Sequence, residues 1–170
     1  MSLRILIGAD LVPTQSNASL FASGDVDQLI DAPLRATLDS ADYRIFNLEV
    51  PLTDVASPID KCGPALIAPQ NTVSGIQKIG TNLAALANNH ILDQGEQGLV
   101  STLQTLSGAG IAYVGAGNNP AQAQKPYIIE KTASKSGSMP ARNMNFRLPP
   151  VNPPEPIRLT RWKVWIISQS

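Results

Sequence analysis

Residues 82–95 read NLAALANNHILDQG, a short apolar run that ends in a cluster of polar side chains. The apolar part has the length and composition of a buried strand. Asn88, Asn89 and His90 follow it directly, and His90 is the only histidine among the 170 residues. A strand that ends in polar residues and leads into a helix is typical of α/β proteins, in which ligands gather beyond the carboxyl ends of the strands.

The segments on both sides continue this alternation of strands and helices. Short apolar runs predict strands, and apolar positions at helical spacing predict helices. We expect strands at residues 3–8, 43–50, 82–88, 111–117 and 126–131. We expect helices at residues 28–40, 74–80 and 96–110, and loops at residues 13–27 and 52–70. The alternation indicates an α/β fold with largely parallel strands.

The composition favours one globular domain. Hydrophobic residues make up 43% of the chain and aromatic residues 5%, so the core is expected to consist of Leu, Ile, Val and Ala. The single cysteine, Cys62, excludes an internal disulfide and favours a reducing compartment. We expect no signal peptide, because the apolar run near the start of the sequence is short, and no membrane span, because no stretch approaches roughly 18 apolar residues. These features together predict a cytoplasmic protein. Because the net charge is zero, we expect no binding of nucleic acid.

Polar residues close three of the expected strands. Asp10 follows the first strand, Asn47 and Glu49 close the second, and the Asn-Asn-His sequence follows the third. Carboxylates, amide oxygens and an imidazole can together bind divalent cations, which activate water and stabilise the leaving oxygen of a phosphoryl group. Ordinary roles also fit: turns or caps for Asp10 and the asparagines, a solvated strand end for Glu49, and a helix start for Asp93. Spacing alone leaves both interpretations open.

Four stretches of the sequence resemble the bacterial CapA family of capsule and poly-γ-glutamate synthesis proteins. They read IFNLEVPLTD, PIDKCGP, LANNHILDQGEQGLVSTLQTL and GIAYVGAGNNPAQAQKP, and the resemblance covers about residues 4–131. The CapA family is similar to the calcineurin-like metallophosphoesterases. The resemblance therefore implies the N-terminal part of a metallophosphoesterase-like four-layer α/β sandwich. It also implies hydrolysis of a phosphate ester with divalent metal ions, namely Mn, Zn or Fe, as cofactors.

The resemblance also implies roles for individual residues. Asp10, Glu49 and Asn89 correspond to metal ligands, and His90 to the catalytic residue that assists the leaving group or orients phosphate. The substrate-binding residues would be Asn47, Lys61, Asn88 and Asp93. A dinuclear site needs more donors than these three ligands, and no histidine follows His90. The substrate is expected to be a small molecule or a polymer. Two alternatives stay open: a non-catalytic accessory protein that binds polymer or partner subunits, and an inactive truncated product.

The composition changes abruptly near Lys131. Residues 1–131 carry a net charge of −5, whereas residues 132–170 carry +5, six of the fourteen prolines and both tryptophans. We expect residues 1–131 to be an incomplete CapA-like metallophosphoesterase-type domain, and residues 132–170 to be an irregular basic tail produced by a frameshift. A natural Pro-rich linker is the alternative, and the coding DNA after codon 131 distinguishes the two. An incomplete sandwich leaves an apolar sheet face uncovered, so we expect marginal stability or self-association.

Overall fold

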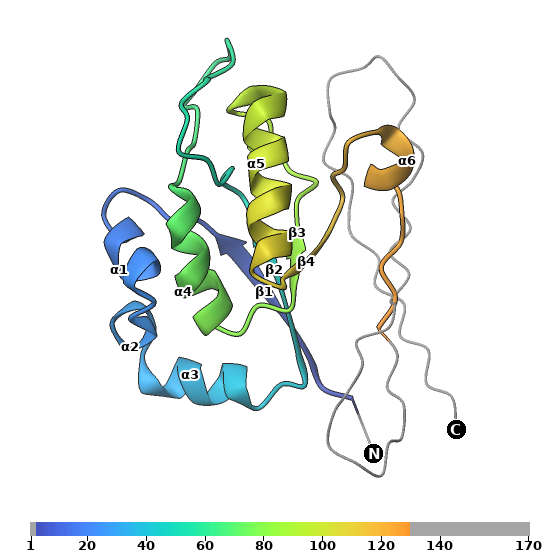
Figure 1. The fold of residues 1–170 in the computed structure, drawn as a ribbon. Helices are drawn as coiled ribbons and strands as arrows, with labels where there is room; N and C mark the ends of the chain where they lie inside the picture. Colours follow the sequence, from blue (N-terminus) through green and yellow to red (C-terminus); the bar gives the residue numbers. More distant parts are fainter. Residues whose placement is uncertain (1–2, 130–170) are drawn as a thin grey trace. The chain divides into compact units, whose positions relative to one another are not determined.

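The sheet at the centre of the fold consists of parallel strands. A computed structural model of the chain describes residues 3–129 (Figure 1). Four strands form one sheet in chain order: β1 (Ile5–Leu11), β2 (Tyr43–Leu48), β3 (Leu83–Ala85) and β4 (Ala112–Val114). β1 pairs with β2 and β2 pairs with β3, both in parallel. The predicted α/β class is confirmed.

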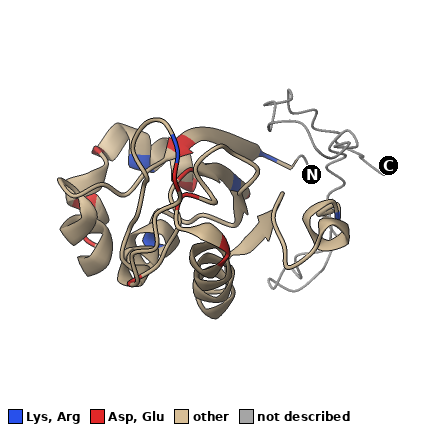
Figure 2. Ribbon diagram, turned by 90° about the horizontal axis from the view of Figure 1, so that it is seen from above, with Lys and Arg blue, Asp and Glu red and all other residues tan. Residues whose placement is uncertain are grey.

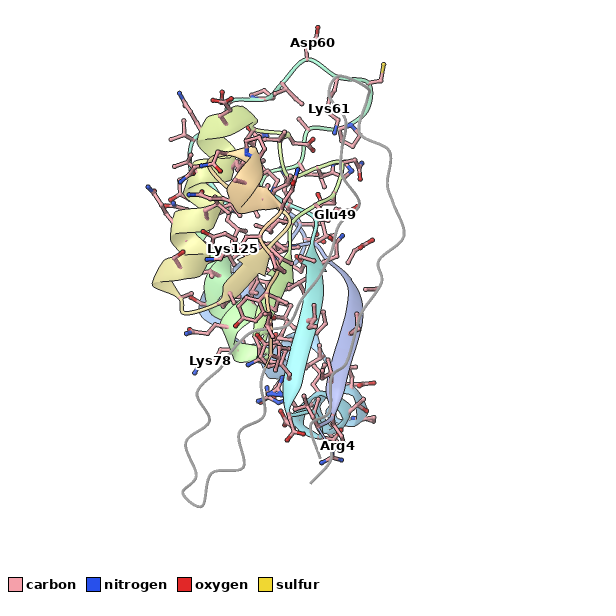
Figure 3. All side chains as sticks on the ribbon, turned by 90° about the vertical axis from the view of Figure 1, so that its right-hand side faces the viewer. Arg4, Glu49, Asp60, Lys61, Lys78 and Lys125 are labelled. Atoms are coloured by element: carbon pink, nitrogen blue, oxygen red, sulfur yellow. The ribbon has the colours of Figure 1, made fainter. Side chains whose placement is uncertain are left out.

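Helices separate the strands along the chain. They are α1 (Ala18–Ser23), α2 (Val26–Leu29), α3 (Ala32–Asp39), the 3-10 helix η1 (Gln70–Thr72), α4 (Val73–Lys78) and α5 (Gly95–Gly108). Helices α4 and α5 lie along one face of the sheet (Figures 1 and 3). A second compact unit begins at Val114 and contains α6 (Pro120–Ala123). None of the helices in the described residues is long and apolar enough to cross a membrane.

The core is built around β3, the strand with which the sequence analysis began. All three of its residues are buried, as expected of an inner strand in a parallel sheet. Leucines from neighbouring elements complete the core, and Leu48, Leu86 and Leu106 are each 0% exposed. The core therefore consists largely of Leu, Ile, Val and Ala, as the composition predicts.

Two predicted elements near the N-terminus differ from the structure. The loop expected at residues 13–27 contains α1, which ends at Gly24 with a φ of 70°, a conformation that favours glycine. The helix expected at residues 28–40 is interrupted because the Asp31 side chain accepts a hydrogen bond from the backbone N–H of Leu34 and caps α3. Local capping therefore divides what the apolar spacing predicts as one helix.

The predicted strand at residues 126–131 is also wrong where the structure describes it. Residues 126–128 have no regular secondary structure, and Ile129 forms only a bridge. The predicted tail at residues 132–170 lies outside the described residues.

Helix α1 packs against α4 at Gly75, where there is no room for a side chain. A Cβ atom at Gly75 would lie 2.6 Å from the Cα of Phe21 and 2.8 Å from its carbonyl oxygen. We expect Gly75→Ala to lower the free energy of unfolding by about 1–3 kcal/mol, because the backbone of α1 must move. Urea unfolding measures this change.

Gly108 provides the matched control in an exposed part of α5. A Cβ atom at Gly108 meets no other atom within 4 Å. Gly108→Ala is therefore expected to be neutral or to stabilise the protein by up to about 1 kcal/mol. Equal destabilisation by both substitutions would contradict the steric explanation for Gly75.

Candidate functional site

Side-chain hydrogen bonds connect the carboxyl ends of three adjacent strands. Asp10 and Asn47 are direct partners in the register of β1 and β2. The Asn47 amide nitrogen Nδ2 donates to Oδ1 of Asp10 at 2.8 Å. Asn88, which follows β3, donates in turn from Nδ2 to Oδ1 of Asn47 at 3.2 Å. These three predicted site residues therefore lie together at one edge of the sheet.

Asn88 makes the most side-chain hydrogen bonds of the three residues in this hydrogen-bonded line from Asp10 through Asn47 to Asn88. Its Nδ2 also donates to the carbonyl oxygen of Leu48 at 2.9 Å. Its Oδ1 accepts the backbone N–H groups of His90 at 3.0 Å and Ile91 at 2.9 Å. A carboxamide has two N–H donors and two acceptor lone pairs, so all four are in use. Asn88 is only 6% exposed, and it fixes the turn that carries His90 to the end of β2.

A second cluster forms around Asp93, which is 0% exposed. Its Oδ1 accepts from Nζ of Lys61 at 2.5 Å, and its Oδ2 lies 2.7 Å from Nδ1 of His90. Oδ2 also accepts the backbone N–H of Leu66 at 2.7 Å. Burial raises the pKa of Asp93, but the hydrogen bonds from Lys61, His90 and Leu66 outweigh it and lower the pKa below its ordinary value. The carboxylate is therefore ionised at neutral pH.

Asp93 and its neighbour Gln94 also hold the 57–66 loop, which carries Lys61. Gln94 is 2% exposed, and its Oε1 accepts the backbone N–H of Ser57 at 2.7 Å. Its Nε2 donates to the carbonyl oxygen of Leu66 at 2.9 Å. The sequence analysis missed Gln94, because a glutamine in a polar turn carries no pattern that indicates burial. Figure 3 shows the loop beyond the sheet, with Asp60 at its tip.

Glu49 and Asn89 have side chains outside these two clusters. Glu49 follows β2, where its backbone N–H donates to the carbonyl oxygen of Leu11 at 3.3 Å, and Figure 3 shows it at the end of that strand. Asn89 is exposed. Among residues 3–129, no group of three or more His, Cys, Asp or Glu side chains could hold a metal ion. Asp10, Glu49 and Asn89 instead offer oxygen donors, which suit hard cations such as Mn²⁺ and Mg²⁺.

The hydrogen bonds of Gln94 predict that it limits the motion of the 57–66 loop. Gln94→Leu leaves the Ser57 N–H and the Leu66 carbonyl without partners, at a cost of about 1–3 kcal/mol. We expect the Ser57 amide to exchange its hydrogen roughly ten- to a hundredfold faster, as measured by hydrogen–deuterium exchange. Gln97→Leu, on the exposed side of α5, is the control and should leave this rate unchanged.

The lowered pKa of Asp93 predicts sensitivity to acid. The carboxylate contributes its full stabilisation well above the ordinary pKa of 3.8, and this contribution is lost as the pH falls through the lower folded-state pKa. We therefore expect the wild type and Asp93→Asn to differ by a constant free energy of unfolding near neutral pH. This difference should shrink below about pH 4. Urea unfolding across the acid range tests this, and a difference that does not change with pH would contradict it.

The parallel sheet, with helices along it, is that of a metallophosphoesterase-like α/β protein. Residues 5–145 match the family model described as bacterial capsule synthesis protein PGA_cap. The chain therefore belongs to this family, which is associated with the synthesis of capsules and poly-glutamate. The resemblance to the CapA family is confirmed.

Individual relatives are much longer than this chain. A protein of Mycobacterium tuberculosis (strain H37Rv), named as a probable polyglutamine synthesis accessory protein, is 34% identical over 90 residues, which cover 53% of this chain and 24% of the relative. The capsule biosynthesis protein CapA of Bacillus anthracis is 39% identical over 54 residues, which cover 32% of this chain and 13% of the relative. The chain thus matches a quarter or less of the length of each.

Proposed function

We propose that this chain carries the part of a capsule or poly-glutamate synthesis protein that hydrolyses a phosphate ester with the help of a divalent cation. One observation carries the proposal: the hydrogen-bonded line from Asp10 through Asn47 to Asn88, which joins the ends of three parallel strands. Ligands of α/β proteins bind at this edge of the sheet. His90, the only imidazole, is attached to the same line through its backbone N–H.

In this proposal, Asp10, Glu49 and Asn89 bind the cation. Oδ1 of Asp10 accepts from Asn47, which leaves Oδ2 for a metal. The side chains of Glu49 and Asn89 form no hydrogen bond within residues 3–129, so their oxygens are also available. Two carboxylates and an amide oxygen favour Mn²⁺ over a softer metal such as Zn²⁺. When bound, the cation would polarise the phosphoryl oxygen and lower the pKa of a water ligand.

His90 supplies the proton chemistry in this proposal. Its Nδ1 faces Asp93, whereas Nε2 has no hydrogen bond within the described residues. The side chain of His90 is 17% exposed, and a protonated Nε2 could donate its proton to the leaving oxygen of a phosphate ester. Lys61, whose side chain is 20% exposed, adds a positive charge beside His90 that would attract the anionic substrate.

The four residues predicted to bind substrate differ in burial and hydrogen bonding, which supports different roles for them. Asn88 and Asp93 are buried, and their hydrogen-bonding groups are already engaged by protein atoms. We assign them to positioning rather than to substrate contact. Asn47 bridges Asp10 and Asn88, and Lys61 is the charged group of the four that reaches solvent.

The test combines metal binding with hydrolysis. Calorimetry with Mn²⁺, together with the Mn²⁺-dependent release of phosphate from p-nitrophenyl phosphate, should give both signals with the wild-type chain and neither with Asp10→Ala. Asp60→Ala, which removes an exposed carboxylate from the loop tip, is the matched control and should retain both. A wild-type chain that neither binds Mn²⁺ nor releases phosphate would refute the proposal.

A second candidate function is non-catalytic binding of a polymer or a small molecule. One observation favours it: residues 3–129 contain no group of three His, Cys, Asp or Glu side chains that could hold a metal. The name of the mycobacterial relative also describes an accessory protein. Figure 2 shows the basic residues scattered over several elements of the described part. If poly-glutamate is captured equally by wild type and His90→Ala in the absence of hydrolysis, this candidate replaces the first.

We also propose that the chain self-associates through its sheet. Ile7 of β1 is 57% exposed, although its register partner in β2, Ile45, is only 4% exposed. β1 stands at one end of the strand order, where a second copy can cover the apolar side chain. Sedimentation should show dimers that Ile7→Lys abolishes. A concentration-independent monomer would contradict self-association.

A further inference from the structure

β1 contains one extra residue just before Asp10. Its regular pairing with β2 ends where Ile7 lies opposite Ile45, and it resumes where Asp10 lies opposite Asn47. Between these two pairs, β1 has two residues and β2 has one. This count defines a β-bulge, which is rare between parallel strands, often lies next to a functional site and redirects a side chain there.

The bulge determines which face of the sheet Asp10 occupies. In a regular ladder, Asn47 would lie opposite Ala9. Asp10 would then lie opposite Leu48 and on the other face, because successive residues alternate between the two faces. A carboxylate would thus stand beside Leu48, which is 0% exposed. The bulge instead puts Asp10 beside Asn47, and Leu48 has an apolar partner in Leu11.

The ring of Phe46 identifies Ala9 as the extra residue. A Cβ atom at Gly8 would collide with Cδ1 and Cε1 of this ring, so the ring occupies the place that a side chain of Gly8 would need. This close contact keeps Gly8 opposite Phe46. Ala9 is exposed and has no partner in the register of β2. Removal of Ala9 would therefore leave a strand of regular length between Ile7 and Asp10.

The side chain of Asn47 holds Asp10 where the ladder is interrupted. A bulge disrupts the backbone hydrogen bonds between strands, so the backbone alone fixes the next residue less firmly. Nδ2 of Asn47 donates to Oδ1 of Asp10 at 2.8 Å, and Oδ1 of Asn47 accepts from Nδ2 of the buried Asn88 at 3.2 Å. Backbone bonding beyond the bulge includes the N–H of Glu49, which donates to the carbonyl oxygen of Leu11 at 3.3 Å.

We propose that Asn47 is a positioning residue, needed because the bulge in β1 interrupts the ladder at Asp10. In this inference Asn47 contacts neither the cation nor the substrate, and its amide directs the Asp10 carboxylate into the site. The effect on cation binding rests on the proposed function, whereas the bulge and the role of Asn47 within it do not. The requirement for Asn47 should therefore disappear when the extra residue is removed.

The test compares Asn47→Ala in the wild-type strand and in a chain from which Ala9 is deleted. In the metal-free protein, nuclear Overhauser effects between β1 and β2 report the register, and hydrogen–deuterium exchange of the Glu49 amide reports the ladder beyond the bulge. Calorimetry with Mn²⁺ reports cation binding. In the wild-type strand, Asn47→Ala should speed the Glu49 exchange about tenfold and weaken Mn²⁺ binding about ten- to a hundredfold.

The deletion separates positioning from direct contact. Without Ala9, the strand is regular and Asp10 should still lie opposite Asn47, so Asn47→Ala in that chain should produce neither effect. Ala9→Ser is the matched control, because it changes the exposed side chain and keeps the number of residues. It should behave as the wild type, and Asn47→Ala in its presence should have the full effect.

The outcomes separate this inference from the proposed function. A wild type in which Ala9 lies opposite Asn47 would overturn the inference, and this measurement needs no variant. Equal losses from Asn47→Ala with and without Ala9 would overturn it too, because Asn47 would then act directly on the ligand or on the fold. A chain that cannot fold without Ala9 would count against it in the same way. If the wild type binds no Mn²⁺, the proposed function fails, but faster Glu49 exchange only in the presence of Ala9 would support the inference.

Discussion

Replacing Asn88 with alanine is expected to lower the free energy of unfolding by about 2–4 kcal/mol. The side chain makes four hydrogen bonds, to Asn47, Leu48, His90 and Ile91. Truncation leaves two backbone N–H groups and one carbonyl oxygen without these partners. Because Asn88 is only 6% exposed, water cannot replace all of these bonds. Urea unfolding of the metal-free protein measures the loss.

The neighbouring asparagine provides an unusually close control. Asn89 is exposed and makes no side-chain hydrogen bond within the described residues, so Asn89→Ala should change stability by less than about 0.5 kcal/mol. If Asn89 binds the cation as proposed, its replacement should instead weaken Mn²⁺ binding in calorimetry. Similar losses of stability at both positions would contradict the assignment of Asn88 as the structural member of the pair.

His90→Ala is expected to have the largest effect on activity. General acid catalysis contributes about 10²- to 10⁴-fold, so the Mn²⁺-dependent hydrolysis of p-nitrophenyl phosphate should fall by this factor. Mn²⁺ affinity should stay near that of the wild type, because His90 is not among the proposed metal ligands. Steady-state rates and calorimetry on the same samples give both quantities.

Added imidazole distinguishes loss of the acid from loss of structure. The substitution leaves a space beside Asp93, and free imidazole that binds there should restore part of the rate. Asp93→Ala should not be rescued in this way, since it retains His90. A loss below tenfold in His90→Ala would show that the imidazole does not take part in the chemistry.

The sequence pattern predicts where the site lies, because apolar strands that end in polar residues place those residues at one sheet edge. It predicts the bounds of β1, β2, β3, α4 and α5 to within a few residues, because each of these elements has its own run or helical spacing of apolar residues. The pattern could not predict α1, because this helix has six residues and only Phe21 among them is buried, so it shows no apolar spacing over several turns. Asp31 likewise acts through one capping hydrogen bond, which periodicity does not reveal.

The roles within the site depend on individual hydrogen bonds, which spacing does not encode. Asn88 and Asn89 are identical in type and adjacent in sequence, yet one is buried with every polar atom bonded and the other is exposed. Gln94 is buried because two backbone groups of the 57–66 loop need a partner. Such differences arise from tertiary contacts, and only the three-dimensional structure shows them.

The agreement between strand order and chain order has a consequence for synthesis on the ribosome. Each strand of the β1-β2-β3 series can join its neighbour as it emerges, without waiting for a later segment to insert between them. The residues from Asp10 to Asp93 that form the two hydrogen-bonded clusters all precede α5. The end of the sheet that carries these clusters can therefore form during translation, before the part of the chain that follows α5 has been made.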